Sequence, residues 1–214
     1  MNRPLIISDC DEVLLHMVVP FQQWLDECKD IDFKLDSSDF SKALHYRADN
    51  KPVPPEEIWG LLGAFFDSGM HRQKPIEGAI ESINGLSAHA DIVVLTNLMD
   101  HRMEARKEQL KSFGLDVRVF CNQGPKGPAL QKIIEEYAPE QALFIDDLAQ
   151  HHQSVGEMLP DVWRLHMVGE PLLAPHIKAA PFAHKRCDEW ARAKTWIAGI
   201  LDGGDRAPPI DSQA

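Results

Sequence analysis

The chain has 214 residues, of which 44% are hydrophobic and 26% are charged. This length and composition are typical of one globular domain with a substantial core, and they exclude a disordered or fibrous protein. The formal net charge of −11 argues against a nucleic-acid partner, because phosphate backbones are bound by basic surfaces.

Five short apolar runs without polar alternation are predicted to be strands that are buried on both faces of a parallel sheet. In chain order they are residues 4–8, 92–95, 117–120, 142–145 and 162–167. Helical patterns follow or precede the later strands, at residues 76–89, 101–113, 128–137, 150–159 and 185–201. This alternation predicts an α/β fold, a Rossmann-like three-layer sandwich with a central parallel sheet.

Residues 17–75 interrupt the alternation, because about sixty residues separate the first strand from the next helix of the sheet type. Helical patterns lie at residues 20–29 and 55–67, and little of this segment reads as strand. We therefore predict a core domain made of residues 1–16 and 76–202, with a small α-helical cap, residues 17–75, inserted after the first strand. The tail, residues 203–214, includes a Pro-Pro pair and is predicted to be disordered.

The cysteines and the apolar stretches predict the compartment. The four cysteines lie far apart without a C-x-x-C pair, so neither a zinc site nor a disulfide framework is predicted. The longest uncharged apolar stretch, residues 58–66, is too short to span a bilayer, and residues 1–10 lack the pattern of a signal peptide. We therefore expect a cytoplasmic protein that has no membrane partner.

Polar side chains follow the ends of three predicted strands, and a lysine opens the helix after a fourth strand. In chain order they are Asp9, Asp11, Thr96, Asn97, Lys126, Asp146 and Asp147. In an open α/β sheet, groups at the carboxyl ends of the strands meet at one edge, around the point where the strand order reverses. We therefore expect these side chains to lie close together.

The residue types in this set favour phosphoryl transfer. Clustered carboxylates repel one another unless a cation holds them, and hard oxygen ligands suit Mg²⁺. Lysine and threonine side chains suit the oxygen atoms of a phosphoryl group. Because Asp9 and Asp11 are two residues apart, one can attack phosphorus while the other transfers protons. The set therefore predicts Mg²⁺-assisted chemistry through an aspartyl-phosphate intermediate.

Four segments resemble the four motifs of the haloacid dehalogenase (HAD) superfamily, in the order that this family has them. They are residues 6–13, 93–97, 126–128 and 143–147. One Asp-x-Asp match is common by chance, whereas four ordered matches at predicted strand ends and helix starts are specific. The resemblance implies the α/β core predicted above, with the inserted segment as a cap that closes over the site and selects the substrate.

The resemblance also implies a role for each matching residue. Asp9 would be the nucleophile that accepts the phosphoryl group, and Asp11 the general acid and base. The residues that would bind the phosphoryl oxygens are Thr96, Asn97 and Lys126, and the Mg²⁺ ligands would be Asp9, Asp11, Asp146 and Asp147. The second Asp of the first motif favours phosphate chemistry, because the dehalogenases of the family lack it.

Two positions depart from the family pattern. Glu12 stands where a glycine often follows the second Asp, which is expected to alter the turn into the cap. His151 stands where some members have a further acid, but the adjacent Asp146-Asp147 pair is itself a recurrent variant, so we expect metal binding to survive. His151 and His152 are expected at the surface, because adjacent helical residues point in different directions.

We therefore predict an enzyme, a Mg²⁺-dependent phosphatase that hydrolyses a small phosphorylated metabolite. One alternative is a phosphomutase that uses the same aspartyl phosphate, and another is a catalytically quiet HAD-like binding or regulatory protein. The sequence selects neither the substrate nor the oligomeric state.

Overall fold

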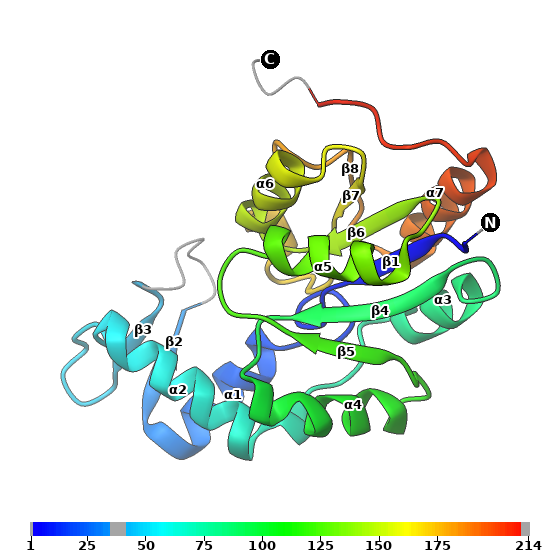
Figure 1. Cartoon of the computed structure of the whole chain (residues 1–214). Helices are drawn as coiled ribbons and strands as arrows, with labels where there is room; N and C mark the ends of the chain where they lie inside the picture. The colour runs from blue at the N-terminus through cyan, green and yellow to red at the C-terminus, as the bar shows by residue number, and fades with distance from the viewer. Residues whose placement is uncertain (1, 35–41, 211–214) are drawn as a thin grey trace.

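The central feature of the computed structural model, which describes residues 2–34 and 42–210, is a six-stranded parallel sheet (Figure 1). The strands are β1 (Leu5–Ser8), β4 (Asp91–Thr96), β5 (Arg118–Cys121), β6 (Ala142–Asp146), β7 (Trp163–His166) and β8 (Lys185–Arg186). Their order in the sheet is β5-β4-β1-β6-β7-β8. The strand order therefore reverses beside β1, which is where such sheets place their ligands.

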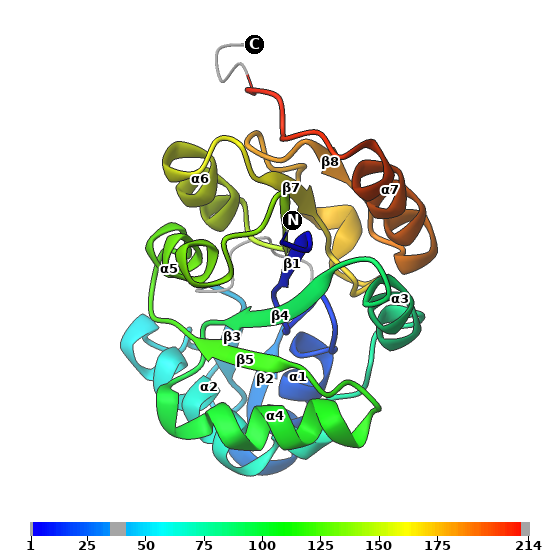
Figure 2. The ribbon, with the colours of Figure 1, turned by 45° about the vertical axis from the view of Figure 1, so that its right-hand side comes forward.

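Helices cover both faces of this sheet (Figure 2). One face packs against α3 (Ala79–Leu86), α4 (Met103–Ser112) and α7 (Trp190–Gly203), and the other against α5 (Gly127–Tyr137) and α6 (Ala149–Met158). Alternate side chains of β1 pack against the helices on opposite faces of the sheet. Ile6 belongs to one apolar cluster, and Leu5 and Ile7 belong to the other. The predicted three-layer α/β sandwich is confirmed.

The described residues of the inserted segment, 17–34 and 42–75, lie beside this core (Figure 1). They contain α1 (Val18–Lys29), α2 (Pro55–Ser68) and the short 3₁₀ turn η2 (Met70–Arg72), with an apolar cluster that includes Phe21 and Phe65. They also contain an antiparallel pair, β2 (Ile31–Phe33) and β3 (Leu44–Tyr46), which the sequence did not predict. Each of these strands has three residues, too few for an alternating pattern to be recognised.

The C-terminal part of the chain differs from the prediction at residues 185–186. Residues 185–186 form β8 instead of helix, because their backbone pairs with β7, and α7 begins at Trp190. Residues 204–210 belong to the tail, residues 203–214, that we predicted to be disordered; most of them are exposed, and hydrogen bonds attach them to the core. The Asp205 carbonyl accepts hydrogen bonds from the side chains of Gln141 and Trp163, which anchor this segment. Residues 211–214 lie outside the described residues.

Helix α6 buries two side chains that we predicted at the surface. His151 is 2% exposed and His152 is fully buried. The His152 ring lies against the rings of Phe144 and His166, and its Nε2 donates to the Asp146 carbonyl at 2.9 Å. His152 therefore packs between α6 and the sheet. Among the described residues, no helix is both long and apolar enough to cross a membrane.

Acid is expected to destabilise the fold through His152. Burial lowers the pKa of this imidazole from 6.5 to about 4. Between these two pH values the unfolded chain binds a proton here and the folded chain does not, so stability falls as the pH falls. The loss from this group should reach roughly 3 kcal/mol near pH 4.

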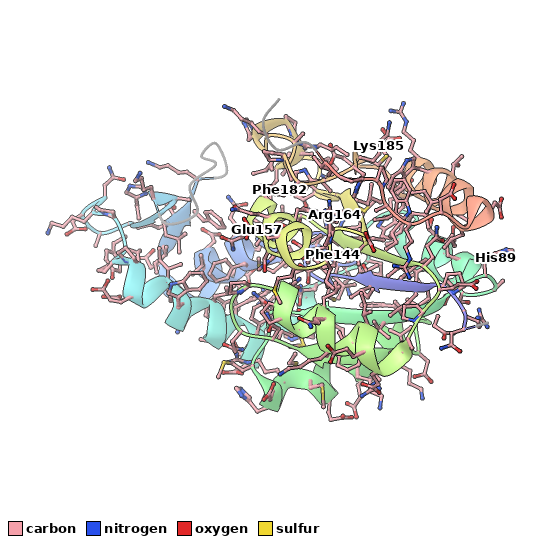
Figure 3. The ribbon with its side chains drawn as sticks, turned by 45° about the horizontal axis from the view of Figure 1, so that its top comes forward. His89, Phe144, Glu157, Arg164, Phe182 and Lys185 are labelled. Atoms are coloured by element: carbon pink, nitrogen blue, oxygen red, sulfur yellow. The ribbon has the colours of Figure 1, made fainter. Side chains whose placement is uncertain are left out.

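Urea denaturation at pH steps from 7 to 4 measures this effect. His152→Gln should show a shallower decline of the free energy of unfolding than the wild type. The matched control is His89→Gln, because His89 is exposed and points away from the core (Figure 3). Equal slopes in the wild type and His152→Gln would contradict the prediction.

Candidate active site

The carboxyl ends of β1, β4 and β6 open on a cavity of about 360 Å³ that residues 17–75 also line. Its lining includes five of the seven predicted site residues, namely Asp9, Asp11, Thr96, Asn97 and Asp147. Asp9 is fixed to the sheet because its backbone N–H donates to the Ile145 carbonyl at 2.8 Å. The other two predicted residues, Lys126 and Asp146, are fully buried behind this lining.

Lys126 connects two of the carboxylates. Its Nζ lies 2.8 Å from Asp9 Oδ1 and 2.7 Å from Asp146 Oδ2. The lysine directly precedes α5, whose first residue is Gly127. A Cβ atom at Gly127 would lie 2.6 Å from the Ser154 carbonyl oxygen, so only glycine allows α5 to approach α6 this closely. This close approach sets the position from which the lysine reaches the carboxylates.

The acidic cluster holds more negative charge than Lys126 neutralises. Carboxylate oxygens of Asp9, Asp146 and Asp147 all lie within 4.8 Å of one another. Burial raises the pKa of Asp9 to about 7, with Lys126 opposing and the neighbouring carboxylates adding to the shift. Burial and the charge of Asp146 also raise the pKa of Asp147 well above its ordinary value. Both groups therefore favour protons in this arrangement.

Asp146 behaves differently from the other two carboxyl groups. Burial alone raises the pKa of Asp146, but the Lys126 ammonium and the two α6 imidazoles outweigh this effect, so the pKa is lowered. A divalent cation beside the three carboxylates would neutralise the charge that now favours protons on Asp9 and Asp147. The donors are all oxygen atoms, so the set fits a hard cation such as Mg²⁺.

Asp11 is held by two residues outside the four motifs. Arg106 Nη2 donates to Asp11 Oδ1 at 3.0 Å, and Gln73 Nε2 donates to the same oxygen at 2.6 Å. The two partners also contact each other, because Arg106 Nη2 donates to Gln73 Oε1 at 3.1 Å. The Arg106 side chain is fully buried, and its Nη1 donates to Cys10 Sγ at 3.0 Å. Asp11 therefore sits in a rigid polar network.

The charge of Arg106 is secured by its surroundings. Burial lowers the pKa of the guanidinium, but Asp11 and Cys10 outweigh that effect and raise it. A signal for this residue was present in the sequence, because Met103, Arg106 and Leu110 follow helical spacing on one face of α4. Such a face is expected to be buried, so an arginine within it needs a partner. No comparable signal marks Gln73.

Glu12 adopts a backbone conformation that favours glycine. Its φ of +58° lies in the left-handed region, which costs about 1 kcal/mol for other residues. Its Oε1 accepts hydrogen bonds from the N–H groups of Met17 at 2.8 Å and Val18 at 2.5 Å, at the start of α1. These bonds offset the cost, so the turn keeps the backbone conformation that favours glycine. The Glu12 side chain also connects the core to residues 17–75.

Asn97 and His151 lie next to each other at the cavity wall. Asn97 Nδ2 is 3.5 Å from His151 Nε2, and it donates to the Gly124 carbonyl at 3.0 Å. Asn97 Oδ1 accepts from Asn122 Nδ2 at 2.9 Å. The Asn97 side chain therefore braces the loop that leads to Lys126 and also lines the cavity. Thr96 is 1% exposed and lines the cavity from the end of β4.

Comparisons with known proteins establish which fold this is. No family model matches the chain, and a search of curated proteins finds no match. Among solved structures, a haloacid dehalogenase-like hydrolase from Streptococcus pneumoniae is similar, with a TM-score of 0.61 and 11% identity over 92% of this chain and 98% of that chain. A candidate beta-phosphoglucomutase from Thermotoga maritima has a TM-score of 0.61 and 13% identity over 92% and 99% of the two chains.

A third similar structure is a candidate phosphoglycolate phosphatase from Lactobacillus delbrueckii subsp. bulgaricus. It has a TM-score of 0.58 and 10% identity over 92% of this chain and 99% of that chain. At these identities the likeness shows the fold alone. The HAD-like fold that the four motifs predicted is therefore confirmed over nearly the whole chain.

Proposed function

We propose that this protein is a Mg²⁺-dependent phosphatase that hydrolyses a small phosphomonoester through an aspartyl phosphate on Asp9. The observation that carries the proposal is the buried cluster in which Lys126 joins Asp9 to Asp146 beside Asp147. The cluster combines a nucleophile, a fixed positive charge and oxygen ligands for a hard cation at one cavity. The fold, shared with hydrolases of the HAD type, supports the same chemistry.

Asp9 is oriented for attack on phosphorus. Its Oδ1 accepts hydrogen bonds from the Cys10 backbone N–H at 2.7 Å and from Lys126, which leaves Oδ2 as the attacking oxygen. Attack forms the bond from Oδ2 to phosphorus and breaks the bond from phosphorus to the alcohol oxygen. Thr96 and Asn97, at the end of β4, would donate hydrogen bonds to the transferred group.

Asp11 would transfer the protons of both half-reactions. It would protonate the leaving alcohol oxygen, and then accept a proton from the water that attacks the aspartyl phosphate. Arg106 and Gln73 hold the carboxylate in position for this work. Gln73 Nε2 also donates a hydrogen bond to the His16 carbonyl at 3.2 Å. The chain passes from the core into residues 17–75 after His16 and returns to the core soon after Gln73. The position of Asp11 is therefore linked to both ends of the inserted segment.

The Mg²⁺ ion would be held by Asp9, Asp146 and Asp147, with Asp11 contributing. When bound, it would stabilise negative charge on the phosphoryl oxygens as a Lewis acid. The carboxylates of this chain would then stay ionised at neutral pH, where burial now favours protons on Asp9 and Asp147.

Metal removal tests the proposal. Phosphate release from p-nitrophenyl phosphate should fall at least about 100-fold in EDTA and recover when excess Mg²⁺ is added, because charge neutralisation contributes several kcal/mol to the barrier. A second readout is the melting temperature, which Mg²⁺ should raise in the wild type but not in Asp147→Asn. Release that is unaffected by EDTA would contradict the proposal.

The same assay separates the two alternatives. A phosphomutase would release little net phosphate and would need a bisphosphate primer, whereas a binding protein would show the Mg²⁺-dependent rise in melting temperature without turnover. Phosphate release without a primer excludes both.

A further inference from the structure

The described residues of this segment, 17–34 and 42–75, contribute only apolar side chains to the cavity that Asp9 lines. They are Met17, Val18, Phe33, Trp59, Leu62 and Phe66. From the core side, the segment after β7 adds further apolar residues, among them Leu173 and Ile177. Apart from the strand-end residues and the α6 side chains Gln150 and His151, the space for the alcohol part of a phosphomonoester is therefore walled by hydrocarbon and aromatic rings.

The two arginines of the same segment contact acids away from the cavity. Arg47 forms ion pairs with Asp26 and Asp32, and Arg72 Nη1 lies 2.8 Å from Glu27 Oε2. Neither arginine lines the cavity. In fact, no lysine or arginine of residues 2–34 and 42–210 lines it. A second anionic group on a substrate would find no cationic partner in the described lining.

Among the described residues, the titratable side chains that line the cavity are acidic apart from His151. The acids are Asp9, Asp11, Glu12 and Asp147. A carboxylate or second phosphate on the substrate would leave water for largely apolar surroundings, where no lysine or arginine of the described residues offers a partner. This loss opposes binding, because a charge that is desolvated without a partner costs several kcal/mol.

From these three observations we infer that the substrate is a monoester of an apolar, uncharged alcohol, either a short alkyl or an aromatic phosphate. Sugar phosphates and phosphorylated carboxylic acids do not fit the lining. The inference rests on the proposed phosphatase function, which it makes more specific. Trp59 is 70% exposed although it lines the cavity, so its ring is available to contact such an alcohol group.

Two substrates that differ in one terminal group test the inference. n-Hexyl phosphate and 6-(phosphonooxy)hexanoate have the same leaving oxygen and six carbons each, and the second has a carboxylate in place of the terminal methyl group. We expect kcat/KM to favour the hexyl ester by about 100-fold or more. In the series from ethyl to hexyl phosphate, kcat/KM should rise about fourfold per methylene until the cavity is filled. Equal rates for the pair, or a flat series, would overturn the inference.

A binding arm separates this inference from the proposed function. Hexylphosphonate and its carboxylate-terminated analogue are not hydrolysed. Calorimetry with these two compounds and Mg²⁺ therefore measures how the cavity lining affects binding affinity, independently of turnover. Turnover of p-nitrophenyl phosphate without discrimination between the phosphonates overturns only the substrate class. Discrimination between the phosphonates without any phosphate release supports the apolar site and contradicts the phosphatase.

Variants on α2 locate the effect. Leu62→Arg places a cation in the lining and should lower kcat/KM for hexyl phosphate about tenfold while raising it for 6-(phosphonooxy)hexanoate. Leu61→Arg is the matched control, because Leu61 is equally half-buried on the same helix but does not line the cavity. Trp59→Ala changes an exposed residue and so preserves the fold, and it should lower kcat/KM for hexyl phosphate about tenfold more than for ethyl phosphate. A Leu61→Arg variant with the selectivity of Leu62→Arg would contradict the assignment.

Discussion

Asp9→Asn is expected to reduce kcat for phosphate release by at least about 10⁴-fold, the scale on which enzymes lose activity without their nucleophile. The amide retains an oxygen that Lys126 and the Cys10 N–H can contact, but an amide oxygen is too weak a nucleophile to attack phosphorus. The loss should appear in kcat with every substrate, whatever its alcohol group. Phosphate release by purified wild type and variant, under identical Mg²⁺ concentrations, measures it.

The fold should survive this substitution. Burial raises the pKa of Asp9 to about 7, so near neutral pH the carboxyl group already carries a proton part of the time, and asparagine resembles that form in size and charge. The denaturation midpoint of the variant should therefore stay close to that of the wild type. Asp161→Asn, at an exposed acid that pairs with Arg206, is the matched control and should keep full activity. Activity that persists in Asp9→Asn would mean that another group attacks phosphorus.

The site residues that the sequence predicted all lie at the end of a strand or the start of a helix, which can be located from local sequence. Asp9, Thr96 and Asp146 each stand at the end of a buried apolar strand, and Lys126 stands at the start of a helix. Strand ends can be located from local composition, and the parallel topology then brings them to one edge of the sheet. No long-range contact had to be guessed, so both the fold and the cluster could be predicted.

The residues that the sequence did not predict depend on contacts between distant segments. Gln73 and Arg106 reach Asp11 from positions 62 and 95 residues further along the chain, and neither follows a motif. The strands β2, β3 and β8 have two or three residues each and exist because a neighbouring backbone pairs with them. The hydrogen bonds that attach residues 204–210 likewise come from donors of the core, such as Trp163. Such pairings leave little local pattern in sequence.

Lys126→Met is expected to cost about 3–5 kcal/mol of stability near pH 8, because it leaves the buried carboxylates of Asp9 and Asp146 facing each other without a positive charge. Methionine has a similar length and is apolar, so the cost comes from the charges and not from a cavity. In the wild type, Asp146 and Asp9 outweigh burial and raise the pKa of Lys126, so the ammonium stays charged throughout the working range of pH. A lysine on the outer face of the same helix offers the matched control, Lys132→Met, which should change stability by less than about 0.5 kcal/mol.

The pH dependence distinguishes this explanation from a simple packing defect. Without the ammonium, the folded-state pKa of Asp9 rises further above its unfolded value of 3.8. A carboxyl group with a raised pKa binds a proton in the folded state, and the stability that this provides is lost as the pH rises through the folded-state pKa. Lys126→Met should therefore be clearly less destabilised at pH 5 than at pH 8 in urea denaturation. If the loss is equal at both pH values, the buried charges do not cause it. Mg²⁺ should restore part of the stability at pH 8, because the cation supplies the positive charge that the substitution removed.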